Sequence, residues 1–113
     1  MGTGEADILE RLFAVILERR ERRPPDSYVV RLLDGGLPAI AAKIREEGEE
    51  VIAAASGADR EHTAREVADL VFHTWVLLAA CDVSPSRVFA ALEQRFGTSG
   101  LVEKASRGPR DAE

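Results

Sequence analysis

The chain has 113 residues, which is enough for one domain but not for two independent hydrophobic cores. A hydrophobic fraction of 45% with 31% charged residues is typical of a globular protein and argues against disorder. The net charge of −5 argues against nucleic acid as a partner. The single cysteine, Cys81, excludes an internal disulfide and a multi-cysteine zinc site.

We expect a cytoplasmic protein without a membrane segment. The residues after Met1 lack the positive charge of a secretory signal, and Ala6 departs from the N-myristoylation pattern. The longest mostly apolar stretch, residues 67–81, is too short to cross a bilayer, and it contains Asp69 and His73.

Helical periodicity dominates the chain, and no run alternates with a period of two for long. Five helices are expected, at about residues 5–23, 27–33, 38–55, 60–81 and 84–97. Pro24-Pro25 ends the first, Gly35-Gly36 the second and Ser56-Gly57 the third, while Ser27 and Ser84 cap the second and the fifth. The pattern predicts an all-α bundle of four to five helices over residues 1–97. A polar tail follows over residues 98–113, and we expect it to order when substrate binds.

The helix expected over residues 60–81 is apolar almost all the way round from Val67 onward. A helix of that kind is buried on every side. One chain with two or three other long helices can hardly surround it, so we expect a homodimer whose second subunit covers the far face. We expect Trp75 at the helix-bundle or subunit interface, and Cys81 as a small core residue.

Acidic residues of the helix over residues 38–55 gather on one side. Lys43, Glu46, Glu47 and Glu50 fall within about 100° of one another on a helical wheel, whereas Glu49 lies elsewhere. The apolar stripe of this helix borders the cluster. In an ordinary amphipathic helix, by contrast, most acidic residues face away from the core.

The following helix repeats the arrangement with Glu66, Asp69 and His73, which share a face of about 60°. Asp69 lies in the most apolar part of the chain, where an ionised carboxylate is costly unless something pairs with it. Antiparallel packing of the two helices would bring all five carboxylates together, with Lys43 as the nearby compensation. A divalent cation would resolve this repulsion, and an all-oxygen site favours magnesium or manganese.

Each acidic motif taken alone is more typical of a solvated helix face than of a metal site. Their combination on successive helices, with Asp69 inside an apolar run, favours the metal site. A lone histidine in an apolar helix is most often a hydrogen-bonded core residue. We therefore expect His73 to support the core or the metal ligands.

These residues carry a resemblance. E-E-x-x-E (Glu46, Glu47, Glu50) followed on the next helix by E-x-x-D (Glu66, Asp69) resembles the signature of the all-α, MazG-like nucleoside triphosphate pyrophosphohydrolases. Further blocks are similar to the phosphoribosyl-ATP pyrophosphohydrolase family within that group: R-x-x-x-P-x-x-S-Y-V-x-x-L from Arg20, K-I-R-E-E-G-E-E-V from Lys43, E-V-A-D-L-V-F-H from Glu66 and L-E-Q-R-F-G-T-S-G-L-V-E-K-A-S-R from Leu92. Together they span nearly the whole chain in order.

The resemblance implies an enzyme that hydrolyses phosphoribosyl-ATP to phosphoribosyl-AMP and pyrophosphate, the second step of histidine biosynthesis. It implies a magnesium ion, or manganese, held by four carboxylates: Glu47, Glu50, Glu66 and Asp69. Glu46 is a candidate ligand or general base, and Glu47 a catalytic residue. In some members this activity is fused to a zinc-binding cyclohydrolase domain, for which 113 residues leave no room. We expect the stand-alone form.

The same resemblance favours a set of substrate-binding residues: Arg20, Ser27, Tyr28, Lys43, Ser99, Lys104 and Arg107. Lys43 is equally well explained as damping repulsion among the glutamates. Arg20 belongs to a local group of arginines, Arg19, Arg20, Arg22, Arg23 and Arg31, around the Pro24-Pro25 turn. Most of these arginines are better explained as a solvated helix end that interacts with the helix dipole.

Two other functions stay open at this point. The first is a MazG-like hydrolase of ordinary or damaged nucleoside triphosphates, against which the Ser27-Tyr28 and C-terminal blocks argue. The second is a non-enzymatic helical dimerisation module with merely solvated glutamates, which would bind no metal and would tolerate Asp69→Ala.

Overall fold

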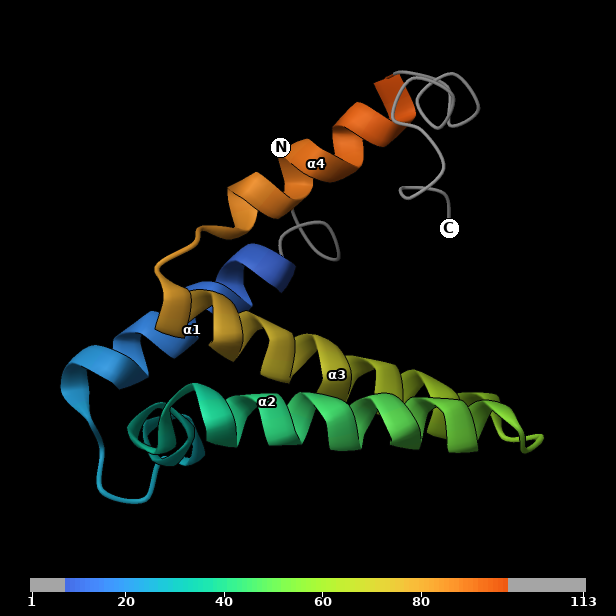
Figure 1. The fold of residues 1–113 in the computed structure, drawn as a ribbon, viewed down its shortest axis with the longest axis horizontal. Helices are drawn as coiled ribbons and strands as arrows, with labels where there is room; N and C mark the ends of the chain where they lie inside the picture. The colour runs from blue at the N-terminus through green and yellow to red at the C-terminus, as the bar shows by residue number, and fades with distance from the viewer. Residues whose placement is uncertain (1–7, 98–113) are drawn as a thin grey trace. The chain divides into compact units, whose positions relative to one another are not determined.

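The computed structural model describes residues 8–97 of the chain (Figure 1). Within this range the chain forms four α-helices and no strand, and the helices are α1 (Ile8–Arg22), α2 (Tyr28–Ala55), α3 (Arg60–Cys81) and α4 (Pro85–Gly97). Helices α1, α2 and α3 pack together in one unit, and α4 belongs to a second unit that begins at Ser84. The all-α prediction is confirmed. The tail expected over residues 98–113 lies outside the described residues.

Helix α2 contains two of the expected helices, joined at Gly36. The backbone of Gly36 has φ 77° and ψ −174°, a conformation that is essentially restricted to glycine. Pro38 follows in the first turn of the second part, where its missing N–H costs little. The chain changes direction there: Figure 1 shows the first part of α2 nearly end-on and the second part running across the view.

Polar side chains cap the helix starts as the sequence suggests. The Ser27 hydroxyl accepts a hydrogen bond from the Val30 amide at 3.2 Å, and the Ser84 hydroxyl accepts one from the Ser86 amide at 3.1 Å. Asp59 caps α3 by accepting hydrogen bonds from two amides of its first turn. Each cap satisfies amides that have no partner inside the helix.

Helices α2 and α3 run antiparallel because only residues 56–59 connect them, and Figure 1 shows them side by side. The Thr63 hydroxyl donates to the Ala54 carbonyl at 3.2 Å and joins the end of α2 to the start of α3. The core between the first three helices contains Ile16, Ile40 and Val76, each fully buried. Burial of one such side chain stabilises the fold by roughly 1.5–3 kcal/mol.

Helix α3 is less uniformly buried than its apolar sequence suggests. Trp75 is buried, and its indole Nε1–H donates to the Leu9 carbonyl at 3.0 Å, which confirms the expectation that it lies at a helix–helix interface. Val67 is 42% exposed. Cys81 is also exposed, at the end of α3, so the expectation of a small core residue was wrong.

In the part of the chain that the structure describes, no single helix is long and apolar enough to cross a membrane. One bent pair, α3 with Pro85–Phe96, passes the same test by length and composition only.

Substitutions at two glycines of α2 test whether Gly36 is the residue at which this helix changes direction. Gly36→Ala places a side chain in a glycine-only conformation, so we expect a loss of about 1–3 kcal/mol in the free energy of unfolding. Gly48→Ala is the matched control: a Cβ there meets nothing within 4 Å, and alanine favours a helix interior over glycine by about 1 kcal/mol. Chemical denaturation measures both. Equal effects of the two substitutions would contradict the assignment of Gly36 as the break.

Candidate metal centre and adjoining pocket

Three of the five expected carboxylates converge between α2 and α3. One carboxylate oxygen from each of Glu47, Glu66 and Asp69 lies within 4.8 Å of the other two. Antiparallel packing produces this arrangement, because Glu47 lies on the side of α2 that meets α3, while Glu66 and Asp69 are one helical turn apart on α3. The predicted meeting of the two acidic motifs is therefore observed for these three residues.

The other two glutamates of α2 lie outside this group. Glu46 is exposed and forms an ion pair with Lys43, whose Nζ is 3.0 Å from Glu46 Oε1 and 3.9 Å from Glu47 Oε2. Glu50 is exposed as well. These contacts place Lys43 where it can damp repulsion within the acidic cluster, one of the two roles expected for it. The hydrogen bond to Glu46 raises the pKa of Lys43.

Glu47 is the most buried of the three carboxylates. Its side chain is only 12% exposed, and this burial raises the pKa of Glu47, as does the neighbouring charge of Asp69. Asp69 is exposed in the single chain, so it is not the buried charge that its apolar neighbours in the sequence indicated. Glu47 is the carboxylate that most needs a compensating cation.

His62 also contacts the cluster, which sequence reasoning did not anticipate. Its Nε2 lies 3.3 Å from the carboxylate of Glu66, one helical turn further along α3. The spacing of four residues on a helix was visible in the sequence and could have indicated this contact. His62 holds the Glu66 side chain from the side that faces the start of α3.

A hydrogen-bonded chain connects the cluster to the start of α2. The Nδ1–H of His73, a buried side chain, donates to the backbone carbonyl of Asp69 at 2.7 Å. Because a carbonyl only accepts, Nε2 of the neutral imidazole is an acceptor, and the Tyr28 hydroxyl donates to it at 2.8 Å. The two hydrogen bonds of His73 connect Tyr28 to the turn of α3 that carries Asp69, which agrees with the supporting role expected for His73.

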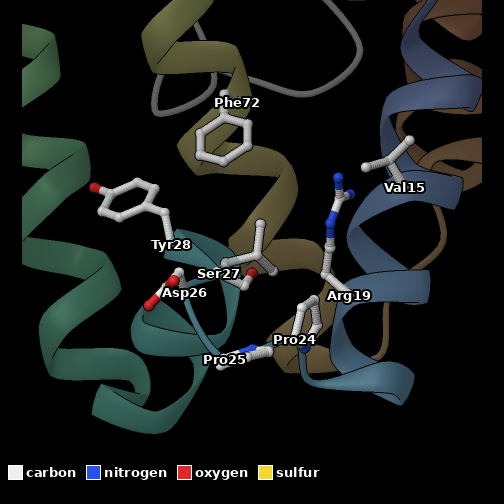
Figure 2. A pocket seen from close by; sticks show the side chains of 9 residues that line it. Val15, Arg19, Pro24, Pro25, Asp26, Ser27, Tyr28 and Phe72 are labelled. Atoms are coloured by element: carbon white, nitrogen blue, oxygen red, sulfur yellow. The ribbon is translucent and has the colours of Figure 1, made fainter.

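A pocket of about 620 Å³ lies between the end of α1, the turn after it, the start of α2 and α3 (Figure 2). Nine residues line it: Val15, Arg19, Pro24, Pro25, Asp26, Ser27, Tyr28, Val29 and Phe72. Two of them, Ser27 and Tyr28, are among the expected substrate-binding residues.

Arg20, another expected substrate-binding residue, is engaged elsewhere in the fold. Its guanidinium donates to the Ala79 carbonyl at 3.0 Å and lies 3.5 Å from the carboxylate of Asp82. These contacts join α1 to the C-terminal end of α3, which indicates a structural role for Arg20. The remaining expected residues, Ser99, Lys104 and Arg107, lie outside the described residues.

The chain is similar to known proteins over most of its length, since residues 9–96 match the phosphoribosyl-ATP pyrophosphohydrolase family. A phosphoribosyl-ATP pyrophosphatase of Novosphingobium aromaticivorans is 52% identical over 101 residues, which cover 89% of this chain and 94% of the relative. This chain belongs to the phosphoribosyl-ATP pyrophosphohydrolase family. The corresponding protein of Geobacter metallireducens is 46% identical over 101 residues, with 89% and 93% covered.

Another relative of the phosphoribosyl-ATP pyrophosphohydrolase family is longer than this chain. It is the histidine biosynthesis bifunctional protein HisIE of Deinococcus radiodurans, 48% identical over 109 residues. The matched region covers 96% of this chain but only 48% of that protein. Membership of the family confirms the resemblance drawn from the acidic motifs and from the blocks around them.

The oxygen donors of the cluster fit a divalent metal ion, which the family resemblance implies. Three carboxylates supply oxygen ligands only, the preference of hard cations such as magnesium. Burial, and next the charge of Asp69, raise the pKa of Glu47, and a bound cation would favour the ionised form of this carboxyl group. The acidic cluster could therefore hold a metal ion through Glu47, Glu66 and Asp69.

Replacement of Glu47 by glutamine tests whether the ionised carboxylate at this position destabilises the fold. A carboxyl group with a raised pKa in the folded state stabilises the protein at low pH and loses that contribution as pH rises above the ordinary value of 4.5. Without divalent cations, we expect Glu47→Gln to be more stable than the unmodified protein at pH 7, with a gain that shrinks toward pH 4.5.

Glu49→Gln, an exposed glutamate of the same helix, is the control and should change stability little. Denaturant titrations at several pH values measure both substitutions. If the Glu47→Gln protein is less stable than the unmodified protein at pH 7, the ionised Glu47 side chain does not destabilise the fold, and the raised pKa is contradicted.

Proposed function

We propose that this protein hydrolyses phosphoribosyl-ATP to phosphoribosyl-AMP and pyrophosphate, the second step of histidine biosynthesis. The observation that carries the proposal is the convergence of Glu47, Glu66 and Asp69 from adjacent helices in a chain of this family. The names of the relatives support the substrate and the pathway. Because pyrophosphate is the leaving group, water attacks the α-phosphorus and the bond between the α- and β-phosphates breaks.

Magnesium is the proposed cofactor, with manganese as a substitute. Glu47, Glu66 and Asp69 would hold the ion, and Glu50, three residues beyond Glu47 on α2, would be a fourth carboxylate ligand. The bound ion would neutralise phosphate charge and lower the pKa of water at the site.

Residues at the edge of the cluster have separate proposed roles. Glu46 is exposed and lies outside the group of three carboxylates, so its carboxylate is the candidate to accept the proton of the attacking water. Lys43 holds Glu46 through its 3.0 Å ion pair and offers an ammonium group to a phosphate oxygen.

A homodimer is the proposed assembly, and a small nucleotide is the proposed ligand. Large apolar side chains are exposed on both helices of the cluster: Leu37 is 50%, Ile52 64% and Val67 42% exposed. A second copy would cover such positions, as expected for an apolar α3. The net charge of −5 argues against nucleic acid, and the proposed substrate suggests the cytoplasm as the location.

A pyrophosphate-release assay tests the reaction. With magnesium, we expect the protein to release pyrophosphate from phosphoribosyl-ATP much faster than from ATP or dCTP, and EDTA should abolish the release. Faster release from ATP or dCTP would instead support a general nucleoside triphosphate hydrolase, and no release from any substrate would support a dimerisation module.

Asp69→Ala tests the site within the same assay. Loss of one of three converging carboxylates should reduce kcat by roughly 10²-fold or more, because the charge of the transition state loses its compensation. The fold should persist, since the substitution relieves repulsion with Glu47. Glu49→Gln is the control. A well-folded Asp69→Ala protein with full activity would contradict the proposed site.

The molar mass in solution tests the homodimer. Light scattering coupled to size-exclusion chromatography should give about twice the chain mass of 12.3 kDa. Val67→Glu should shift the protein toward the monomer, because it would place a charge where apolar contact is proposed. A monomeric unmodified protein at micromolar concentration would reject the dimer.

A further inference from the structure

The pocket described above reaches to within one helical turn of the acidic cluster. Phe72 lines the pocket and lies three residues after Asp69 on α3, a rise of about 4.5 Å. Tyr28, whose ring stacks on Phe72, is hydrogen-bonded to His73, which in turn donates a hydrogen bond to the Asp69 carbonyl. A ligand whose phosphates lie at the cluster would therefore extend toward this pocket.

The lining of the pocket suits a planar ring system. A volume of about 620 Å³ lies within the usual range for small-molecule sites, about 300–1,000 Å³. Most of its lining is apolar, from valine, proline and aromatic side chains. The rings of Tyr28 and Phe72 stack on each other, with an interplanar angle of 16° and centroids 6.1 Å apart, and together they form an aromatic surface in the lining. Aromatic faces of this kind stack on nucleobases.

One cation of the arginine group is directed toward this pocket. Figure 2 shows the Arg19 side chain beside Val15, with its guanidinium between Val15 and Phe72. Among the residues the structure describes, Arg19 forms an ion pair only with Glu18, at 4.0 Å, the limit of such a contact. Its guanidinium thus has donors available for an anion.

The other arginines around the turn have closer charged partners, a backbone acceptor or an aromatic ring as partner. Arg20 is bound to the end of α3, and Arg23 lies 2.8 Å from the carboxylate of Asp34. Arg22 lies 3.5 Å from Glu18, and Arg31 lies over the Tyr28 ring, 5.7 Å from its centroid. Arg19 is the member of this group that lines the pocket.

Phosphoribosyl-ATP has phosphate at both ends, a triphosphate on one ribose and a single phosphate on the second ribose, with the purine between them. We propose that the pocket binds the purine and the second ribose phosphate, and that Arg19 donates hydrogen bonds to that phosphate. This assignment rests on the proposed function and makes Arg19 the residue that distinguishes phosphoribosyl-ATP from ATP.

A carboxylate also lines the pocket, and its position is compatible with this ligand. Figure 2 shows the Asp26 carboxylate on the other side of Ser27 from the Arg19 guanidinium. It therefore lies apart from the site of the second phosphate. Asp26 and the Ser27 hydroxyl can instead accept hydrogen bonds from ribose hydroxyl groups.

The test compares Arg19→Ala with Arg22→Ala in the full chain. Both side chains lie in the last turns of α1 and pair with Glu18, but only Arg19 lines the pocket. KM and kcat for phosphoribosyl-ATP are measured for each protein, together with the inhibition constants of phosphoribosyl-AMP and AMP. Thermal melting shows whether each variant is folded.

We expect Arg19→Ala to raise KM for phosphoribosyl-ATP by about 10- to 100-fold with little change in kcat, because one charged contact remote from the reacting bond is lost. The inhibition constant of phosphoribosyl-AMP should rise in parallel and that of AMP should not. Arg22→Ala should change none of these values. Phe72→Leu should weaken both inhibitors equally, since both contain the purine.

An Arg19→Ala protein that binds phosphoribosyl-AMP as tightly as before, or that loses affinity for AMP equally, would overturn the assignment of Arg19. If the unmodified protein hydrolyses phosphoribosyl-ATP, such a result rejects the pocket assignment alone. If it does not hydrolyse phosphoribosyl-ATP at all, the proposed function fails, and this inference fails with it.

Discussion

Repulsion among carboxylates held together by two packed helices is the constraint on which the site depends. Two unit charges about 5 Å apart repel by roughly 3 kcal/mol at an effective dielectric constant near 20. Glu47, Glu66 and Asp69 lie that close because α2 and α3 are antiparallel and joined by a short connection. Lys43 relieves part of this cost from the side of α2. The apolar core of the unit, with Ile40 and Val76 fully buried, stabilises the arrangement.

Much of the fold and of the acidic site was accessible from the sequence, because both depend on local rules. Helix ends follow from proline, glycine and capping residues such as Ser27, whose effects act within one turn. Spacings of three residues place Glu66 and Asp69 on one face whatever surrounds the helix. The break at Gly36 was also predicted, although the two expected helices form one continuous element across it.

Features that depend on long-range contacts were not accessible in the same way. Asp69 lies in an apolar run yet is exposed, while Glu47 is the more buried carboxylate, because burial depends on which faces of α2 and α3 meet. The arginines near Pro24 look equivalent in the sequence. Only their contacts separate Arg20, bound to the Ala79 carbonyl, from Arg19, which lines the pocket. The pocket itself combines three helices and a turn.

The hydrogen-bonded chain through His73 has a direction, and this direction limits what Tyr28 can bind. The one proton of the Tyr28 hydroxyl is directed to His73 Nε2, because the other ring nitrogen donates to the Asp69 carbonyl. The hydroxyl oxygen then presents only lone pairs to a ligand. This oxygen can accept a hydrogen bond from an amino group or a ribose hydroxyl, whereas the lone pairs of a phosphate oxygen would repel it. Any ligand atom that reaches this hydroxyl must therefore be a hydrogen-bond donor.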